Sequence, residues 1–573
     1  MKQSVRAVVL SVMIATSVFG GFVGSTTADH NDLPGTFVNE EQNDRPYRIY
    51  LPSGYDASTD RPLVVYLLGC TKDTSGDQAD LDQAIERTEI AHLAEEKGFV
   101  VAFADQDESY QTNDCWNWYD YEDRASGEPA IINRITENLQ QNYSVDRRRT
   151  YVAGLSAGAA MTNIMIATYP HQYAAGFAHS GLEYDSADTG TGALDAMDEG
   201  GPDPDTKGID ARQEMDAMDR QVPMMVVHGG ADTRVEPVNG NQTSRQWAQT
   251  IDLAENGQDD NSFESAADTV PGEADRAITH SRANRYDSTE YRFVDDSGDV
   301  LVNYRYIPKL GHDWSGGDGS ESHADPNGPE VRRTMWKFFD DKQLPAQVTV
   351  NVDDFEDDDG LDDYDMDAHD SAGWGYNSYF TDTDDEGSYD GSPPEGSYDL
   401  GAYSDGNVVA THSYDNADGA PFTSLPQAGD EITFKTQADC YDGECSDANT
   451  EKVHSGFIFG AQDADNKYML FFDYDDEQVA LYEKVAGTWS SIEQLSYTLD
   501  STGVWHDVSI DWGENGDITV TVSDESGNTG SFTATDRTFS NGGIGFYKYG
   551  GGAGDGKWSL AYWDNVQVVQ DLD

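Results

Sequence analysis

The chain has 573 residues, 37% of them hydrophobic and 11% aromatic, and it carries 107 acidic against 35 basic side chains. This length and composition favour two or three domains with large cores. The formal net charge of −72 excludes nucleic acid and anionic membranes as partners, because the field of the whole protein repels both. The carboxylates are scattered among predicted helices and strands, which indicates a solvated, halophilic surface rather than an acidic tail.

The N-terminal segment has the pattern of a secretory signal peptide. Lys2 and Arg6 precede an apolar run from about Ala7 to Val23, and small residues follow as far as Ala28. A single membrane anchor is the alternative, but glycines and polar residues interrupt the run. We therefore expect residues 1–28 to be removed and the mature protein to be secreted, extracellular and without a membrane segment.

Residues 45–345 alternate short apolar runs with amphipathic segments. Several apolar runs are almost free of polar residues, as in parallel strands covered on both faces. The predicted strands are 47–52, 62–69, 99–105, 149–156, 173–181, 223–230 and 302–308, and the predicted helices are 80–98, 128–143 and 328–341. Two polar insertions, near 183–220 and 251–285, are expected to be surface loops or a lid, with disorder as the alternative. The alternation predicts a mostly parallel α/β sheet with helices on both faces.

The pattern changes after "DKQLPAQ", where Pro345 marks the expected boundary between a 29–345 domain and a 346–573 domain. Beyond it the apolar runs are short, turn residues separate them and a helical period is missing. The predicted strands are 430–437, 455–462, 467–475, 478–485, 505–513, 517–524, 542–550 and 558–569. Regular strands with tight turns predict an all-β antiparallel sandwich of the jelly-roll type.

Ser156 is the candidate nucleophile. It lies in the pentapeptide "GLSAG", directly after a predicted strand and before the helical segment "AAMTNIMIATY". A serine on a strand-to-helix turn needs small neighbours, because the tight backbone brings the flanking residues together and leaves the hydroxyl exposed. A turn of small residues that serves only packing is the alternative.

A candidate acid and a candidate base follow in the order that the α/β-hydrolase fold uses. Asp232 in "VVHGGADTRVEP" and His312 in "YIPKLGHDWSGG" each follow an apolar strand, at the edge where open α/β sheets collect functional loops. Asp232 would orient His312, which would take the proton of Ser156. The alternative acids are Glu236 and Asp313, and the alternative bases are His179 and His228.

Acyl transfer also needs an oxyanion hole made of two backbone N–H groups. One is expected from Ala157, the residue after the nucleophile, and the other from the loop after an earlier strand. That loop is "LLGCTKD", where Gly69 permits a sharp turn and Cys70 is the natural donor. The Cys70 amide is therefore predicted to matter more than its sulfur.

These segments resemble the esterase family named for polyhydroxybutyrate depolymerases, which also contains feruloyl and acetylxylan esterases. The similarity covers roughly residues 45–342 and rests on "LLGCTKD", "CWNWYD", "GEPAIINRI", "DRRRTYVAGLSAGAAM", "FAHSGLEY", "HGGADTRVEPVNG", "GHDWSGG" and "DPNGPEVRRTMWKFF". It implies an α/β-hydrolase fold, the same triad and the same two oxyanion donors, and it implies no cofactor. Leu68 departs from the family pattern, in which a histidine is common before Gly-Cys.

The four cysteines suggest two disulfides. Cys115 is the other cysteine of the first domain, so a Cys70–Cys115 bridge would fix the oxyanion loop to the loop of "CWNWYD", with two free buried thiols as the alternative. Closing a loop of about 45 residues would stabilise the fold by roughly 4 kcal/mol. Cys440 and Cys445 would close a small loop in the second domain.

The aromatic residues Trp116, Trp118 and Trp314 are candidates for lining the substrate cleft, with core packing as an equal alternative. With "DDFEDDDGLDDY" at its start and "GGIGFYKYGGG" followed by "AYWDNVQVV" at its end, the second domain resembles concanavalin-like or laminin-G-like modules. This resemblance implies a binding role that would hold the enzyme on an insoluble substrate. Its acid runs "DDFEDDDGLDDYD" and "DADNKY" raise the question of calcium, but solvated carboxylates are the default in so acidic a chain. We predict no other metal.

Three functions remain open from the sequence. The first is a secreted serine esterase that cleaves an insoluble polyester, poly(3-hydroxybutyrate) above all, through an acyl-enzyme. The second is a feruloyl or acetylxylan esterase whose C-terminal module binds plant polysaccharide. The third is a non-catalytic binding protein with a degenerate hydrolase domain, against which the complete set of triad residues argues.

Overall fold

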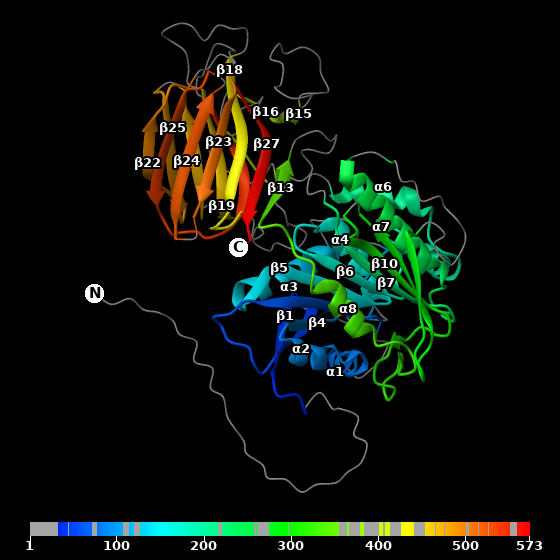
Figure 1. Ribbon diagram of the computed structural model, residues 1–573. Coiled ribbons are helices and arrows are strands. Elements are labelled where there is room, and N and C mark those ends of the chain that lie inside the picture. The colour runs from blue at the N-terminus through cyan, green and yellow to red at the C-terminus, as the bar shows by residue number, and fades with distance from the viewer. Residues whose placement is uncertain are drawn as a thin grey trace, which may run out of the picture.

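The computed structural model places most of the chain in an α/β region and a C-terminal β-sandwich (Figure 1). The residues that the structure describes are 32–43, 45–70, 77–106, 114–119, 127–215, 220–256, 259, 274–295, 297–353, 364–365, 379–382, 400–404, 407–412, 426–440, 453–463, 466–474, 476–499, 504–513, 515–524, 526–550 and 559–572. The predicted signal peptide lies outside the described residues.

A ten-stranded sheet forms the centre of the α/β region. Its order is β1-β2-β4-β3-β5-β6-β7-β10-β9-β8; β4, β3, β5, β6, β7 and β10 pair in parallel, and antiparallel pairs flank them. This is the predicted α/β-hydrolase fold. The strands are β1 Thr36–Gln42, β2 Arg45–Leu51, β3 Arg61–Leu67, β4 Val100–Ala104, β5 Val145–Leu155, β6 Ala175–His179, β7 Met224–Gly229, β8 Arg276–His280, β9 Ser288–Val294 and β10 Val300–Ile307, with a separate pair, β11 Trp314–Ser315 and β12 Ala324–Asp325.

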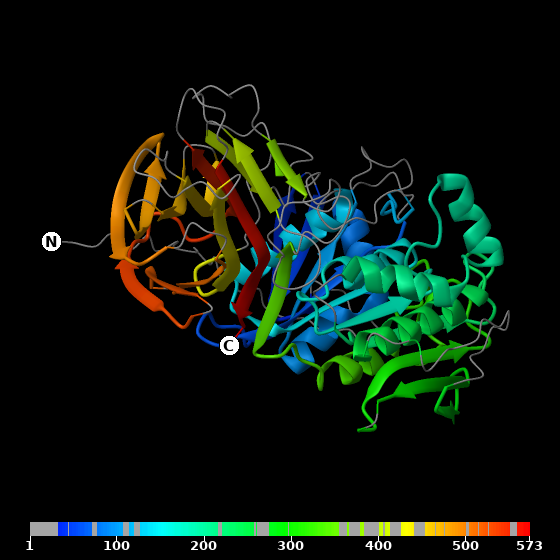
Figure 2. The ribbon, with the colours of Figure 1, turned by 90° about the horizontal axis from the view of Figure 1, so that it is seen from above.

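Helices cover both faces of this sheet (Figure 2). Alternate residues of β3 show why: Leu63, Val65 and Leu67 pack into one core, whereas Val64 and Tyr66 pack into the other. A strand with apolar side chains on both faces needs cover on both. The first core takes side chains from α3, α4, α6 and α7, and the second from α1, α2 and α8. The helices are α1 Asp77–Thr88, α2 Ile90–Lys97, α3 Gly127–Asn142, α4 Ala157–Thr168, α5 Gly190–Glu199, α6 Pro204–Met215, α7 Val238–Asn256 and α8 Val331–Phe339.

Three predicted elements differ from the structure. The predicted helix 80–98 is two helices, because Glu89 between α1 and α2 adopts a left-handed conformation with φ 51°. The polar insertion at 183–220 is not simply a loop, since it contains α5 and α6, and the insertion at 251–285 holds the end of α7 and strand β8. Surface helices with few apolar residues lack the period that would reveal them in a sequence.

The C-terminal part is an all-β sandwich, as predicted. Its two sheets have the orders β15-β16-β27-β18-β23-β24-β25 and β14-β17-β26-β19-β20-β21-β22, with β13 paired to β27. Side chains of both sheets, such as Ile510 and Phe546, form one core. The strands are β13 Gln347–Asp353, β14 Tyr364–Asp365, β15 Tyr379–Asp382, β16 Leu400–Ser404, β17 Asn407–His412, β18 Glu431–Cys440, β19 Val453–Asp463, β20 Asn466–Asp473, β21 Gln478–Val485, β22 Thr488–Ser496, β23 His506–Trp512, β24 Asp517–Asp524, β25 Thr529–Thr535, β26 Gly543–Gly550 and β27 Ser559–Asp571.

The segment between the two parts is held at both ends. Leu344 exchanges hydrogen bonds with Arg148 of β5: its N–H donates to the Arg148 carbonyl at 2.8 Å, and Arg148 Nε donates to its carbonyl at 3.0 Å. The N–H of Leu572, near the end of the chain, donates to the Ala346 carbonyl at 2.9 Å. Leu572 also packs with Val348 in a core that extends into the α/β region. The junction is therefore a packed contact rather than a free linker.

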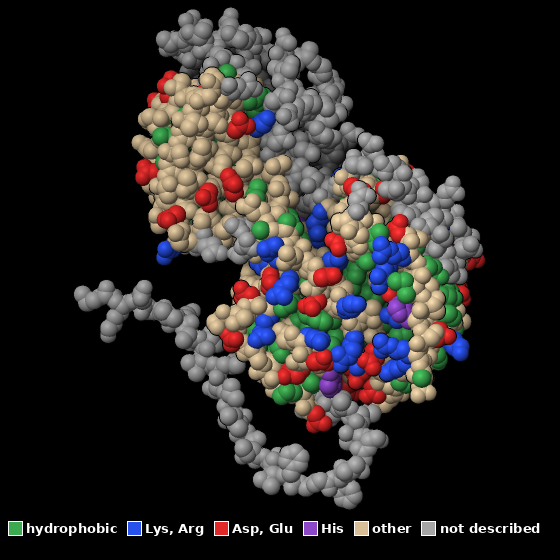
Figure 3. Space-filling model, in the orientation of Figure 1, with side chains coloured by type: hydrophobic (Ala, Val, Ile, Leu, Met, Phe, Trp, Pro, Cys, Tyr) green, Lys and Arg blue, Asp and Glu red, His purple; other side chains and the backbone are tan. Residues whose placement is uncertain are grey.

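Acidic and basic side chains lie intermixed on the face of the α/β region seen in Figure 3. Ion pairs tie α8 to α2 and to the residue between α1 and α2: Arg333 lies 2.6 Å from Glu96, and Arg332 lies 2.7 Å from Glu89. Exposed pairs of this kind stabilise a protein little one by one. In so acidic a chain, these pairs place arginine side chains between carboxylates that would otherwise repel one another.

Substitution of Phe339 tests the packing of α8 on the sheet. The Phe339 ring is fully buried and stacks on Tyr151 of β5 at 4.5 Å. Phe339→Ala should lower the free energy of unfolding by roughly 3 to 5 kcal/mol, because it leaves a cavity in the core. Lys337→Ala, an exposed position of the same helix, should change it by less than about 0.5 kcal/mol. Denaturant unfolding followed by tryptophan fluorescence measures both, and equal effects would contradict the packing.

Candidate active site

Ser156 lies at the sharp turn between β5 and α4. Its backbone has φ 59° and ψ −121°, a strained conformation for a residue with a side chain. Its N–H donates to the His179 carbonyl at 2.9 Å, and its own carbonyl accepts from the N–H groups of Ala159 and Ala160 at 2.9 and 3.0 Å. These bonds fix the sharp strand-to-helix turn that a nucleophile at this position requires.

The turn needs a residue without a side chain at Gly158. A Cβ at Gly158 would lie 2.2 Å from the carbonyl oxygen of Leu67 and 2.5 Å from that of Leu68, both at the end of β3. Carbon and oxygen atoms do not approach so closely without a shift of the backbone. The first turn of α4 thus rests directly on the backbone of β3.

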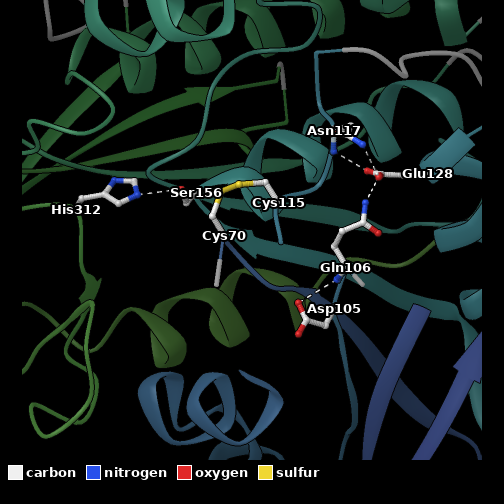
Figure 4. The surroundings of a disulfide bond; sticks show 8 residues. All are labelled: Cys70, Asp105, Gln106, Cys115, Asn117, Glu128, Ser156 and His312. Atoms are coloured by element: carbon white, nitrogen blue, oxygen red, sulfur yellow. Dashed lines mark hydrogen bonds between the residues drawn. A yellow bond between two sulfur atoms is a disulfide. The ribbon is translucent and has the colours of Figure 1, made fainter. Parts of the chain in front are cut away.

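His312 connects Ser156 to Asp232. Its Nε2 lies 2.9 Å from Ser156 Oγ (Figure 4), and its Nδ1 lies 2.8 Å from Asp232 Oδ2. The three residues follow β5, β7 and β10, and the carboxyl ends of these parallel strands share one edge of the sheet. The structure therefore brings the three predicted residues into one chain of hydrogen bonds.

Asp232 is fixed from both sides. It is 1% exposed, and its Oδ1 accepts from the backbone N–H groups of Arg234 and Val235 at 2.9 and 3.0 Å. Burial raises the pKa of Asp232, but the hydrogen bond from His312, the charges of the two neighbouring histidines and the hydrogen bond from the Val235 N–H together outweigh burial and leave the pKa below its ordinary value. An ionised carboxylate is what would hold the Nδ1–H tautomer of His312 and leave Nε2 free to accept a proton.

The alternative histidines have other partners. His228 is fully buried, burial lowers its pKa, and its Nε2 hydrogen bonds to the Val235 carbonyl at 3.0 Å. Burial, together with the charges of His228 and His312, lowers the pKa of His179 to about 3, so this ring is neutral. The N–H of Ser315 donates to His179 Nε2 at 3.3 Å, and the Trp314 ring stacks on His179 at 5.2 Å. His228 thus contacts the loop of Asp232, and His179 contacts the segment that follows His312.

Cys70 and Cys115 form a disulfide across 45 residues, as the sequence analysis suggested. Cys70 follows β3, and Gly69 before it lies against the nucleophile turn: a Cβ on Gly69 would be 2.9 Å from the Leu155 carbonyl and 3.2 Å from Ser156 Cβ. The disulfide thus fixes a loop that borders Ser156 (Figure 4). Cys440 ends β18, but Cys445 lies outside the described residues, so that predicted bridge stays a prediction.

Trp116, Trp118 and Trp314, the candidates for lining the substrate cleft, are buried, which favours the alternative of core packing. Their exposures are 1%, 5% and 0%, and all three belong to the hydrophobic cores. The Trp314 ring contacts Phe177 and Tyr66 as well as His179, at 5.7, 5.8 and 5.2 Å between ring centroids. The sequence left cleft lining and core packing as equal alternatives for these rings, and only their burial distinguishes the two.

Sequence reasoning missed Glu128 at the start of α3. Its carboxylate is 2% exposed and accepts hydrogen bonds from Asn117 and Gln106, close to the disulfide (Figure 4). Its position in "GEP", just inside a predicted helix, looks like an ordinary acidic residue at a helix start. Only the three-dimensional contacts reveal a buried carboxylate here.

Neither a metal site nor a membrane-spanning helix is found among the described residues. Among the described residues, no group of three His, Cys, Asp or Glu side chains has an arrangement that would hold a metal ion. Most of the two acid runs considered for calcium, residues 354–363 and 464–465, lies outside the described residues. The helices that the structure describes include none that is long and apolar enough to cross a bilayer.

Comparison with known proteins supports the esterase resemblance. Residues 45–265 match the family model "Esterase PHB depolymerase". This region belongs to the PHB depolymerase esterase family. Within the family, the chain is 34% identical over 202 residues to poly(3-hydroxyalkanoate) depolymerase C of Paucimonas lemoignei, a match that covers 35% of this chain and 46% of that protein. It is 30% identical over 201 residues to acetylxylan esterase A of Emericella nidulans, which covers 32% of this chain and 65% of that protein.

The chain therefore spans about half to two thirds of the length of these family relatives. Among solved structures, the acetyl xylan esterase from Aspergillus awamori is similar with 19% identity and a TM-score of 0.39, covering 53% of this chain and 99% of that one. The family match covers residues that carry Cys70, Ser156 and Asp232, whereas His312 lies beyond its end. His312 is connected to the family region by its hydrogen bonds.

Gly158→Ala tests the contact between α4 and β3 in this esterase-family region. The added Cβ would push the first turn of α4 away from Leu67 and move Ser156 relative to His312. We expect at least a 100-fold loss of esterase activity, because displacements of about 1 Å in a catalytic group have that effect. Gly190→Ala is the control, since a Cβ there meets only Tyr119 at 3.6 Å. Activity within twofold of wild type in the Gly158 variant would contradict the steric argument.

Removal of the disulfide tests its contribution to stability. Replacing Cys70 and Cys115 together by serine should lower the free energy of unfolding by about 4 kcal/mol, from the entropy of a loop of this length. Chemical unfolding in molar salt, with and without reductant, measures the effect. Reductant should destabilise the wild type by about this amount more than it destabilises the double variant, in which only Cys440 and Cys445 remain. A wild type that is insensitive to reductant while both thiols become titratable would contradict this.

Proposed function

We propose that the protein is a secreted serine esterase that hydrolyses the ester bonds of an insoluble polyester, with poly(3-hydroxybutyrate) as the first candidate. The hydrogen-bonded chain Ser156–His312–Asp232 carries the proposal, because nucleophile, base and orienting acid lie within hydrogen-bond reach of one another. The family match of residues 45–265 supports ester hydrolysis as the reaction class.

In the first half of the proposed reaction, Ser156 Oγ attacks the carbonyl carbon of the ester while His312 Nε2 takes the hydroxyl proton. His312 then gives this proton to the leaving alkoxide, so that an alcohol departs and an acyl group stays on Ser156. Asp232 stabilises the imidazolium that forms between these two steps. In the second half, His312 deprotonates a water molecule that attacks the acyl-enzyme, which releases the carboxylic acid and restores the serine.

The negative charge on the tetrahedral intermediate would be stabilised by the backbone N–H groups of Ala157 and Cys70. Ala157 is the first residue of α4, so its N–H is one of the donors that a helix start leaves unpaired. Cys70 lies next to the nucleophile turn through Gly69 and is fixed by its disulfide. Each such donor is typically worth about 3 kcal/mol of transition-state stabilisation.

The second candidate is an acetyl or feruloyl esterase that acts on plant polysaccharide. The relative from Emericella nidulans, named acetylxylan esterase A, favours it, and the relative from Paucimonas lemoignei, named poly(3-hydroxyalkanoate) depolymerase C, favours the polyester. The higher identity of the latter decides our order. In both cases we propose that the C-terminal sandwich binds the polymer and raises the local concentration of the enzyme there.

Ser156→Ala tests the catalytic assignment. Hydrolysis of a soluble p-nitrophenyl ester in molar salt should fall by about 10⁴-fold or more, because the remaining donors and binding groups supply little rate without a nucleophile. Ser320→Ala, an exposed serine in the loop after His312, should retain wild-type activity. Unchanged hydrolysis by the Ser156 variant, or failure of a fluorophosphonate to label Ser156 in the wild type, would overturn the proposal.

The substrate class is tested by parallel assays in molar salt on a poly(3-hydroxybutyrate) emulsion, acetylated xylan and methyl ferulate. We expect clearing of the emulsion and release of hydroxy acid. Release of acetate from xylan or of ferulate, with an emulsion that stays turbid, would favour the second candidate.

A further inference from the structure

The buried carboxylate of Glu128, near the start of α3, accepts hydrogen bonds from three N–H donors. Its Oε2 accepts from the backbone N–H of Asn117 at 2.6 Å, and its Oε1 accepts from Asn117 Nδ2 at 3.1 Å and from Gln106 Nε2. Gln106 follows β4, and Asn117 lies in the loop 114–119, hereafter the Cys115 loop. One carboxylate therefore holds the end of a strand, the start of a helix and the Cys115 loop together (Figure 4).

A continuous path leads from this carboxylate to the nucleophile. Asn117 is two residues from Cys115, whose sulfur is bonded to Cys70. Cys70 follows Gly69, and the space beside the Gly69 Cα is occupied by the Leu155 carbonyl and by Ser156 Cβ. Figure 4 shows the disulfide between Ser156 on one side and the Asn117–Glu128 pair on the other. A shift of the Cys115 loop would therefore move the Cys70 backbone relative to Ser156.

We propose that Glu128 is a positioning residue of the esterase: its ionised carboxylate holds the Cys115 loop and, through the Cys115–Cys70 bond, holds the Cys70 N–H in place beside Ser156. The proposal rests on the proposed function, in which this N–H stabilises the oxyanion. Glu128 acts only through other residues, since its two oxygens are occupied by Asn117 and Gln106.

The protonation state of Glu128 supports this role. Burial raises its pKa to about 7, although the hydrogen bond from the Asn117 N–H and the charge of Arg45 at the start of β2 act in the opposite direction. Other charged groups on these elements are Asp105, which accepts from the Gln106 N–H at 3.0 Å, Asp114 in the Cys115 loop, Arg48 of β2, and Arg134 and Glu137 further along α3. Below pH 7 a proton on either Glu128 oxygen would face an N–H donor, so one hydrogen bond to the loop would be lost.

Activity and stability should then respond to pH in opposite directions. The contribution of Glu128 to positioning is present above about pH 7 and is lost as the pH falls through that value. Its contribution to stability is greatest at low pH and falls as the pH rises from its ordinary pKa of 4.5 to about 7, because the folded state holds the proton more tightly than the unfolded chain. A merely structural carboxylate would lose activity and stability together.

The test uses Glu128→Gln, which keeps the shape of the side chain and removes the charge. On p-nitrophenyl acetate at pH 8.5, kcat should fall about tenfold while KM changes less than twofold, since the lost interaction is made in the transition state. At pH 5.5 the difference between the variant and the wild type should disappear. The control is Glu137→Gln, a carboxylate of the same helix that is 8% exposed and accepts from Asn133 at 3.0 Å; it lies about 14 Å further along α3 and should leave kcat unchanged.

The disulfide supplies a second, independent test. If Glu128 acts through the Cys115–Cys70 bond, then Glu128→Gln should cause no further loss of kcat in a chain whose Cys70 and Cys115 are both serine. The same tenfold loss in both backgrounds would mean that Glu128 acts by another route and would overturn the proposal. If Glu128→Gln fails to fold, Gln106→Met removes one donor alone and should lower kcat about threefold at pH 8.5.

The outcomes separate this proposal from the proposed function. An unchanged kcat for Glu128→Gln at pH 8.5, in a protein that Ser156→Ala inactivates, overturns the positioning role and leaves the esterase assignment standing. Activity that survives Ser156→Ala overturns the esterase assignment itself, whatever the effect of Glu128. A loss of kcat that is equal at pH 5.5 and 8.5 also overturns the positioning role, because an uncharged Glu128 cannot hold the loop in the way we propose.

Discussion

Contact between the first turn of α4 and the end of β3 sets the geometry on which the candidate site depends. Two backbones meet there without an intervening side chain, because Gly158 lies against the carbonyl groups of Leu67 and Leu68. The contact fixes Ser156 in its strained conformation, and it also brings the residues after β3 next to this candidate nucleophile. The hydroxyl and the proposed oxyanion donors are thus placed by the same pair of elements.

Around this contact, strand pairing and short hydrogen bonds together position the candidate triad. Parallel pairing of β5, β6, β7 and β10 brings the ends of separate strands together, and short hydrogen bonds then align Asp232 and His312. Neutral imidazoles, rather than charged groups, fill the interior behind them: burial lowers the pKa of His179 and of His228. A positively charged ring in either place would attract the Asp232 carboxylate and weaken its interaction with His312.

The sequence was informative where function depends on order along the chain. The strand-turn-helix pattern at Ser156, the later positions of Asp232 and His312, and the Cys70–Cys115 pair could all be inferred from it. It was misleading where function depends on which face a side chain occupies. Trp116 and Trp314 are aromatic residues in loop-like segments, and nothing in their local sequence pattern tells that both rings are buried. Glu128 is one of 107 acidic residues, and only contacts with segments up to 22 residues away distinguish it. Strands β22 and β25 escaped because edge strands with polar faces lack an apolar alternation.

The junction between the two parts of the chain has a mechanical consequence. Leu344 is hydrogen-bonded to β5, and Ala346 is hydrogen-bonded to Leu572. The sandwich is therefore fixed against the α/β region instead of being joined to it by a flexible linker. A flexible linker would let the catalytic region of a bound enzyme reach many ester bonds around each binding point. If the sandwich is fixed to the α/β region, an enzyme bound to a solid substrate through the sandwich can cleave only at one fixed distance from its binding point. Movement of the enzyme across the surface would then depend on how often the sandwich dissociates and binds again. Weak binding by the sandwich would therefore favour turnover more than tight binding.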